Sequence, residues 1–320
     1  MNARRIFLTA IAALSIASGP AVAQDVTKIV VPFPAGGGTD VLMRMLAEEM
    51  TKRGTRVIVE NKPGASAVIA ADYVARSKPD GKTLVVSFVG MLGTNTILFE
   101  KLPYDPQKDF TSVSQVAYQP TIIVGRTALP YKNLKEMVEY ARANPGKINR
   151  GSPGAAILSN LAPVDFEKSI GISTSHIPFN GDAQAIQAML SESIDIYGTS
   201  ITSSLPHIKS GKFRVLGVMD TKRLPQAPDA PTFKEQGFDF VAPLRYYLSA
   251  PAGTPKDVID GLNRTINEVL KDPAFIERAR AVGMEPTGGT PQDMDRLLQA
   301  EIARWMPMVR ALNLPKQDSK

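Results

Sequence analysis

The sequence predicts a two-domain α/β protein, and three features support this fold class. Short runs of β-branched residues alternate with longer stretches of helical periodicity, a pattern typical of a mostly parallel sheet covered by helices. The pattern restarts near Tyr118 and returns near Leu248, which indicates that a second α/β unit is inserted into the first. The 320 residues of the chain are enough for two domains of ordinary size.

The first 23 residues have the pattern of a secretory signal peptide. Arg4 and Arg5 precede a short apolar run at residues 6–17, and Ala21-Val22-Ala23 supplies a small-x-small cleavage site. The apolar run is shorter than the ~20 residues that a membrane-spanning helix needs. We therefore expect an exported, periplasmic protein whose mature chain begins at Gln24.

The elements of the first domain follow in a regular order. Residues 28–33 are predicted to form the first strand, residues 41–52 a helix with one apolar face, and residues 56–60 and 83–88 two further strands. Near the C-terminus, prolines follow Thr254, Asp272 and Thr290, and each pair predicts a helix that begins with a side-chain cap. The last helix should cover residues 292–312, with Trp305 in the core.

The inserted domain is predicted to begin with a strand at residues 121–124. Asn133 and Glu136 then give a capping-box-like start to a helix that Pro145-Gly146 ends. Further extended segments are expected, and they are residues 175–179, 194–197, 214–218 and 240–251. Residues 24–122 and 246–320 should therefore form one lobe and residues 123–245 the other, with two adjacent crossovers between them.

The composition excludes several classes of function. The chain has no cysteine and only two histidines, so thiol catalysis, iron–sulfur clusters and histidine-rich metal centres are not expected. Without Arg4 and Arg5 the formal net charge falls from +6 to +4, a mild excess that favours the approach of small anions. The basic residues are not gathered into a nucleic-acid-binding stripe. We expect a monomer that binds no cofactor, metal or nucleic acid.

The segment VPFPAGGGTD, residues 31–40, is the most informative for function. It leads a strand through three glycines into a helix that Thr39 or Asp40 is expected to cap. Such a turn brings backbone N–H groups and the positive end of the helix together, which makes an anion site. A turn that serves chain geometry alone is the simpler alternative. A dinucleotide site is disfavoured, because Val41 stands where the third glycine of G-x-G-x-x-G belongs.

The glycine turn is the first in a series of recognisable segments. The others, in chain order, are VENKPGAS, PDGKTL, KLPYDPQKDF, NPGKINRGSPG, HIPFNG, APTFKEQG and APAGTP. Together they resemble the Bug receptors, the extracytoplasmic solute receptors of tripartite tricarboxylate transporters. The resemblance implies a type II periplasmic-binding-protein fold, in which two α/β lobes joined by a two-crossover hinge close over an organic carboxylate in the cleft between them. It also implies permease subunits as partners, and neither catalysis nor a metal.

The resemblance also suggests which loops would contact the ligand. These are the first strand-to-helix loop, the loop after the third strand, and two loops of the inserted lobe. The candidate ligand-binding residues are Phe33, Pro34, Ala35, Gly36, Gly37, Thr39, Asp40, Ser87, Val89, Gly90, Ser152, Gly154, Ala155, Ala156, Asn180, Gly181, Asp182, Thr199 and Arg245.

The sequence departs from the family pattern at several positions and leaves the ligand open. Ala65-Ser66-Ala67 replaces much of a glycine-rich run, and Asn180 stands where lysine is common. Arg245 could pair bidentately with a second carboxylate, and Tyr246 or Tyr247 could stack on an aromatic ligand. The alternative is a surface arginine beside tyrosines that pack the hinge.

Two other functions use the same features. An exported hydrolase or isomerase would need a nucleophile with a base, or paired carboxylates, and no G-x-S-x-G, H-E-x-x-H or S-x-x-K constellation stands out. A receptor that presents its ligand to a signalling partner would share the cleft. The predicted function is that of a binding receptor, not an enzyme.

Overall fold

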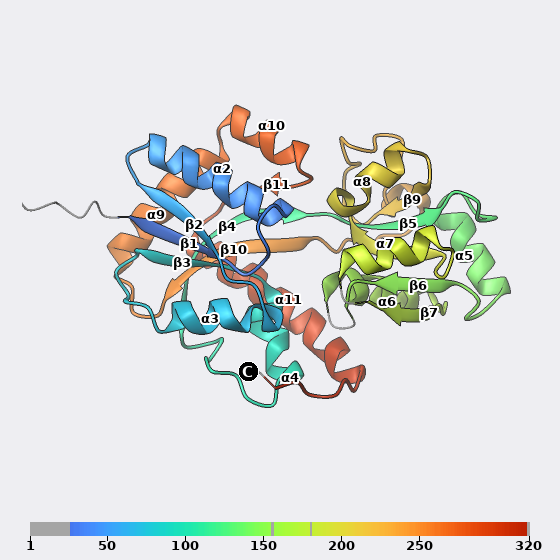
Figure 1. Ribbon diagram of the computed structural model, residues 1–320, viewed down its shortest axis with the longest axis horizontal. Helices are drawn as coiled ribbons and strands as arrows, with labels where there is room; N and C mark the ends of the chain where they lie inside the picture. Colours follow the sequence, from blue (N-terminus) through green and yellow to red (C-terminus); the bar gives the residue numbers. More distant parts are fainter. Residues whose placement is uncertain (1–25, 155–156, 180, 319–320) are drawn as a thin grey trace, which may run out of the picture.

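The computed structural model describes residues 26–154, 157–179 and 181–318, and it consists of two α/β lobes that lie side by side (Figure 1). This confirms the predicted fold class. The predicted signal peptide and the candidate residues Ala155, Ala156 and Asn180 lie outside the described residues.

The first lobe contains a six-stranded mixed sheet with the order β11-β4-β10-β3-β1-β2. Strand β1 is parallel to β2 and β3, whereas β10 is antiparallel to β3 and β4. The strands are β1 (Thr27–Val31), β2 (Val57–Asn61), β3 (Thr83–Ser87), β4 (Phe110–Gln119), β10 (Leu244–Pro251) and β11 (Glu285–Pro286).

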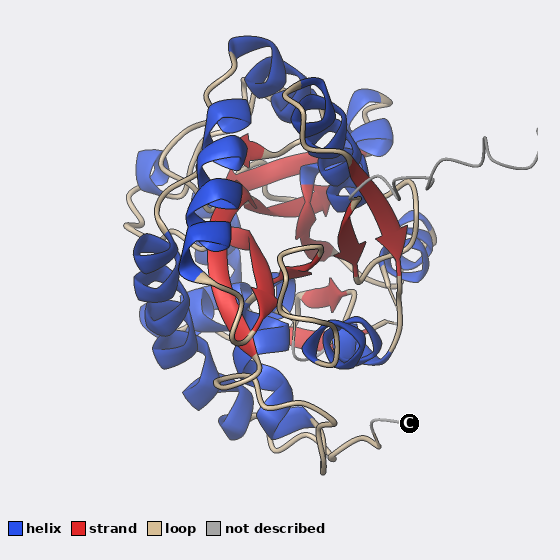
Figure 2. Cartoon of the chain, turned by 90° about the vertical axis from the view of Figure 1, so that its left-hand side faces the viewer, coloured by secondary structure: helices blue, strands red, loops and turns tan. Residues whose placement is uncertain are grey.

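Helices cover both faces of this sheet (Figure 2). Side chains alternate along β1, so Ile29 and Val31 pack beneath α2, α9 and α10, whereas Val30 packs toward α3 and α11. Both faces are buried, which is why β1 reads as an unbroken apolar run. The helices are α2 (Gly38–Lys52), α3 (Val68–Ala75), α4 (Asn95–Leu98), α9 (Lys256–Leu270), α10 (Pro273–Ala281) and α11 (Pro291–Ala311).

The second lobe contains a five-stranded sheet with the order β7-β6-β8-β5-β9. Its strands are β5 (Thr121–Arg126), β6 (Asn149–Ser152), β7 (Ser175–Pro178), β8 (Ile196–Ser200) and β9 (Phe213–Val218). Its helices are α5 (Leu134–Ala143), α6 (Leu158–Ile170), α7 (Asp182–Leu190) and α8 (Ile201–Lys209). Helices α7 and α8 pack on one face of the sheet, and α5 and α6 pack on the other.

The chain passes between the lobes twice. Strand β4 ends at Gln119 and β5 begins at Thr121, so the first crossover is very short. The second crossover leads from β9 to β10, which pairs with β4 over its whole length. Helix α11 adds a contact between the lobes, because Arg304 pairs with Asp165 of α6 at 3.0 Å. Trp305 is buried in the core beside it, as predicted.

Three predicted helix starts are confirmed and two are wrong. Asn133, Asp272 and Thr290 each accept a hydrogen bond from a backbone N–H of the first turn. Thr254 does not cap α9, because its hydroxyl donates to the Pro251 carbonyl at 2.7 Å and the helix begins at Lys256. Helix α2 begins at Gly38, before the predicted capping residues. Among the described residues, no helix is long and apolar enough to cross a bilayer.

Candidate functional site

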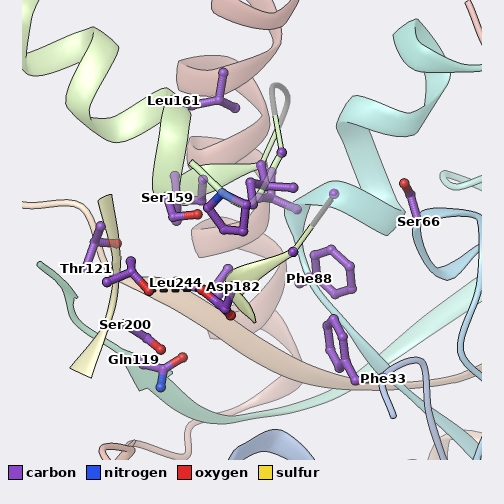
Figure 3. A pocket seen from close by; sticks show the side chains of 18 of the residues that line it. Phe33, Ser66, Phe88, Gln119, Thr121, Ser159, Leu161, Asp182, Ser200 and Leu244 are labelled. Carbon is purple, nitrogen blue, oxygen red and sulfur yellow. Dashed lines mark hydrogen bonds between the residues drawn. The ribbon is translucent and has the colours of Figure 1, made fainter. Parts of the chain in front are cut away.

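A cavity of about 1010 Å³ lies between the two lobes and is lined by residues of both (Figure 3). The first lobe contributes the start of α2 and the segment after β3, and the second lobe contributes the starts of α6, α7 and α8. The crossover residues Gln119 to Thr121 form part of the wall. The cavity therefore lies where relative movement of the lobes would open or close it.

The glycine turn presents unpaired backbone donors to this cavity. Gly37, Gly38 and Thr39 line it, and no described residue accepts a hydrogen bond from their N–H groups. Gly37 occupies the N-cap position, where a glycine offers no side-chain oxygen to satisfy the helix. These N–H groups and the helix dipole therefore point at the space in which an anion would sit.

Asp40 holds the turn rather than contacting the cavity. Its buried carboxylate accepts hydrogen bonds from the Gly36 N–H at 2.8 Å, the Asn61 amide at 2.8 Å and the Arg44 guanidinium at 3.0 Å. Gly36 has a left-handed φ of 85°, which favours glycine. Burial would raise the pKa of Asp40, but the hydrogen bonds from Arg44, Gly36 and Asn61 outweigh it and keep the pKa below its ordinary value.

The second lobe directs three further helix N-termini at the cavity. Ile157 and Leu158 at the start of α6, Gly181 at the start of α7 and Ser200 at the start of α8 all line it. None of these helices, nor α2, has a side-chain cap. The cavity is therefore surrounded by backbone N–H groups from both lobes.

A hydrogen-bonded pair, the buried Ser152 and the half-buried His176, supports the loop after β6. Ser152 donates its one hydroxyl proton to the Gly154 carbonyl at 2.8 Å, so His176 Nε2, at 2.7 Å, carries the proton that it donates to the Ser152 oxygen. Ser152 therefore positions Gly154, which lines the cavity, and does not itself line it. Burial, with a smaller contribution from the positive charge of Arg150, lowers the pKa of His176 to about 4.

The shifted pKa of His176 predicts a loss of stability in mild acid. The folded state disfavours protonation, so the stabilisation is complete above the ordinary pKa of 6.5 and is lost as the pH falls toward about 4. We expect the unfolding free energy of His176→Gln to fall less than that of the wild type between pH 7.5 and pH 4.5, as measured by urea titration. His207→Gln is the matched control. Equal pH dependence in the wild type and His176→Gln would contradict this expectation.

Aromatic side chains form one wall of the cavity. The ring centroids of Phe33 and Phe88 are 5.5 Å apart, and Phe33 meets Tyr246 edge-on at 6.3 Å. The Phe88 ring lies against Gly90 and leaves no room for a side chain there, because an added Cβ would lie 2.4 Å from that ring. Burial raises the pKa of the Tyr246 phenol to about 12; the Thr39 hydroxyl opposes this shift, and the negative charge of Asp182 adds to it.

The cavity wall carries little formal charge. Among the described lining residues, only Asp182 and Lys316 have charged side chains. Asp182 Oδ1 accepts hydrogen bonds from the Tyr197 hydroxyl and, at 3.1 Å, from the Thr199 hydroxyl. The described residues include no group of three His, Cys, Asp or Glu side chains placed to hold a metal ion.

The structure brings about half of the candidate residues to the cavity. Those that line it are Phe33, Gly37, Thr39, Val89, Gly90, Gly154, Gly181, Asp182 and Thr199. Those that it places elsewhere among the described residues are Pro34, Ala35, Gly36, Asp40, Ser87, Ser152 and Arg245.

The structure explains why these candidate residues do not line the cavity. Pro34 and Ala35 are exposed to solvent and do not line the cavity. The hydroxyl of Ser87 is buried within the sheet, 2.7 Å from that of Ser249. The guanidinium of Arg245 pairs with Glu301 of α11 at 3.1 Å, so the protein itself supplies the carboxylate that Arg245 binds.

Some lining residues were not predicted. The hydroxyl side chains of Ser200, Thr202 and Ser203 at the start of α8 reach the cavity, and a strand followed by a serine-rich helix start was the available signal. Gln317 also lines the cavity, because its backbone pairs with that of Leu98 at 2.7 Å. No local pattern in the sequence marks this contact.

The three residues that replace the glycine-rich run adopt a strained backbone. Ala65, Ser66 and Ala67 have φ angles of 43°, 52° and 75°, and Ser66 lines the cavity. Asn95 donates to the Ser66 carbonyl at 2.9 Å and helps to hold this conformation. A left-handed conformation costs a residue with a side chain roughly 1–2 kcal/mol, which a glycine avoids.

Ser66→Gly is therefore expected to stabilise the protein. The unfolding free energy should rise by about 1 kcal/mol, because glycine adopts the φ of 52° without strain and the exposed Ser66 side chain contributes little buried area. Ala300→Gly, at an exposed position in the interior of α11, is the matched control and should lower the unfolding free energy by about 1 kcal/mol. Chemical denaturation distinguishes them, and a loss of stability in both variants would contradict the expectation.

The fold and the site together define a class of protein. Two α/β lobes joined by two crossovers, with a ligand-sized cavity between them, are the architecture of a type II periplasmic-binding-protein. Residues 42–314 match the family described as "Tripartite tricarboxylate transporter family receptor". The chain belongs to this receptor family, which the sequence motifs predicted.

Similar proteins agree with this assignment. BugT of Bordetella pertussis is 32% identical over 286 residues, which is 88% of this chain and 88% of BugT. The structure of R. palustris Rpa4515 with adipate is 30% identical, with a TM-score of 0.79 over 91% of this chain and 98% of that one. The structure of MatC from Rhodopseudomonas palustris with bound malate is 31% identical, with a TM-score of 0.72 over 89% of this chain and 98% of that one.

Proposed function

We propose that this protein is a periplasmic receptor that captures a small organic carboxylate and delivers it to the permease of a tripartite tricarboxylate transporter. Residues 1–23 direct export and are removed. Residues 24–122 with 246–320 form one closing lobe, and residues 123–245 form the other. The family membership and the ligands of two similar structures, adipate and malate, support a carboxylate ligand.

The unpaired N–H groups at the start of α2 carry the proposal. A carboxylate that accepts hydrogen bonds from Gly37, Gly38 and Thr39 would satisfy donors that the described protein leaves free. Hydrogen bonds to a charged acceptor contribute about 1.5–3 kcal/mol each. The site would thus bind an anion without a cationic side chain.

One observation favours a hydrolase, and it is outweighed. Ser152 and His176 lie within hydrogen-bond distance, as a nucleophile and its base would. Ser152 is fully buried, does not line the cavity and donates its proton to the Gly154 carbonyl. The pair therefore suits loop positioning better than attack on a bound ligand.

Closure of the lobes would complete the site. The lobes meet near the cavity through Thr202, which accepts from Gln119 at 3.1 Å and donates to the Val282 carbonyl at 3.0 Å. A ligand held from both lobes favours the closed state, because only that state makes both sets of contacts. The permease would then recognise the ligand-loaded form.

Thermal melting against a panel of carboxylates tests the proposed function. Acetate, malate, hexanoate, adipate and benzoate sample small, dicarboxylic, aliphatic and aromatic ligands. At 100 times its dissociation constant, a ligand adds about 2.7 kcal/mol, which should raise the melting temperature by several degrees. Failure of every carboxylate to raise it, or chemical turnover of one that binds, would contradict the receptor function.

A further inference from the structure

We propose that the preferred ligand carries a single carboxylate on an apolar body with a ring, and that Asp182 and the Phe33–Phe88 pair select it. This inference rests on the proposed function, which leaves the kind of carboxylate open. The carboxylate would bind at the start of α2, and the rest of the cavity would determine what else the ligand can carry.

The first reason is the charge on the second lobe's side of the cavity. Asp182 belongs to the first turn of α7, where its own negative charge already complements the helix dipole. The Thr199 hydroxyl donates to the Asp182 carboxylate, and its oxygen is 3.3 Å from the hydroxyl oxygen of Ser203 in α8. The negative charge of Asp182 therefore also lies beside the start of α8. Asp182 thus places a negative charge at two of the three helix N-termini of the second lobe, where like charges in contact cost several kcal/mol. The third N-terminus, at the start of α6, is flanked by the apolar side chains of Ile157 and Leu158.

No buried cation compensates for this charge within the described lining. Arg245, the expected partner of a second carboxylate, pairs with Glu301 instead. Lys316 is the one lining residue with a positive side chain, and it is exposed. An ion pair with an exposed lysine is worth at most about 1 kcal/mol, which does not offset the burial of a second charge.

The second reason is the apolar character of the remaining wall. Phe33, Phe88, Phe179 and Leu244 line the cavity, and Figure 3 shows the two labelled rings next to each other on one side of it. Ile157 also lines it and is 41% exposed, so a ligand could remove a large apolar side chain from water. A ligand ring that joins the Phe33–Phe88 pair gains about 0.5–1.5 kcal/mol beyond its buried area.

The size of the cavity agrees with this assignment. A volume of about 1010 Å³ lies at the upper end of the range for small-molecule sites. The cavity therefore has room for a ring beyond the carboxylate.

Matched pairs of ligands test the inference on the wild-type protein. Hexanoate and adipate differ at one end, which is a methyl group or a second carboxylate, and benzoate and terephthalate differ in the same way. By titration calorimetry, we expect the monocarboxylate of each pair to bind at least about tenfold more tightly, which corresponds to 1.4 kcal/mol. Benzoate should bind about threefold to tenfold more tightly than hexanoate.

Variants test which side chains cause these differences in affinity. Asp182→Asn keeps an acceptor for Tyr197 and Thr199 and should narrow the gap between hexanoate and adipate to less than about threefold. Phe88→Leu should weaken benzoate more than hexanoate. Lys316→Gln tests the one cation of the described lining and should change each dissociation constant by less than about threefold. Lys271→Gln, an exposed lysine away from the cavity, is the control and should leave the dissociation constants unchanged.

The outcomes separate this inference from the function on which it rests. Adipate or terephthalate binding as tightly as its monocarboxylate partner would overturn the inference and leave the receptor function intact. Loss of adipate binding in Lys316→Gln would overturn it too, because Lys316 would then hold a second carboxylate. If no carboxylate binds at all, the proposed function fails, and this inference fails with it.

Discussion

Gly37→Val is expected to abolish carboxylate binding while the protein remains folded. Gly37 has ordinary extended backbone angles, with φ −72° and ψ 162°, and an added Cβ would meet only the Pro34 carbonyl, at 3.6 Å. The valine side chain would instead stand in the cavity, in front of the N–H groups of α2. Loss of even one or two hydrogen bonds to a charged ligand should weaken binding by about 100-fold or more.

The variant must be compared with a glycine that lies away from the cavity. Gly261 lies in α9, and an added Cβ there would meet nothing within 4 Å. Gly261→Val adds the same side chain and should leave the dissociation constant unchanged. Calorimetry with the tightest carboxylate of the melting panel measures affinity, and melting without ligand measures stability. Binding to Gly37→Val at wild-type affinity would remove the α2 turn from the site.

Asp40→Ala is expected to lower both stability and affinity. The substitution removes the acceptor of the Gly36 N–H and one of the two acceptors of the Asn61 amide, which also donates to the Phe33 carbonyl at 3.1 Å. Because water can reach the exposed Gly36, the unfolding free energy should fall by about 1–2 kcal/mol. Affinity should fall about tenfold, because the turn that presents the N–H groups is no longer tied to its helix.

Arg44→Ala tests the ion pair between Arg44 and Asp40 apart from the hydrogen bonds that Asp40 accepts from Gly36 and Asn61. Arg44 is half-exposed, so its loss should cost at most about 1 kcal/mol and leave the dissociation constant nearly unchanged. The contribution of Asp40 should also depend on pH in a defined direction. Its folded-state pKa is lowered, so the stabilisation is present above the ordinary value of 3.8 and is lost as the pH falls below it. Equal effects of Asp40→Ala and Arg44→Ala would contradict this role.

The sequence was most informative where local chemistry decides the structure. Apolar runs such as Thr27–Val31 predicted buried strands, and the caps at Asn133, Asp272 and Thr290 predicted helix starts within a residue. The helix cap at Thr254 failed because the hydroxyl had a nearer acceptor in the preceding turn.

Other elements gave weak local signals. Strand β4 reads FTSVSQVAYQ, and its frequent polar residues hide a central strand that β10 and β11 pair on both sides. Helices α6 and α8 contain Pro163 and Pro206, which interrupt the helical pattern. These elements were missed because tertiary pairing, rather than propensity, forms them.

The candidate site also contains residues with a local sequence signal and residues whose positions depend on distant partners. Gly37 was proposed because a glycine-rich turn before a helix marks exposed backbone N–H groups, whereas Gly181 was proposed from the resemblance of HIPFNG to a family segment. The positions of Asp40 and Arg245 could not be predicted, because their partners Asn61 and Glu301 lie far away in sequence. The charges of Asp40 and Arg245 suggested contacts with a ligand, but in the fold both side chains bind other residues of the protein.

A crystal structure of the mature protein with benzoate tests the central claim most directly. We predict that both carboxylate oxygens lie within about 2.7–3.2 Å of backbone nitrogens at Gly37, Gly38 and Thr39, with the ring against Phe33 and Phe88. A benzoate whose carboxylate points away from the start of α2, or that binds outside the cavity between the lobes, would contradict it.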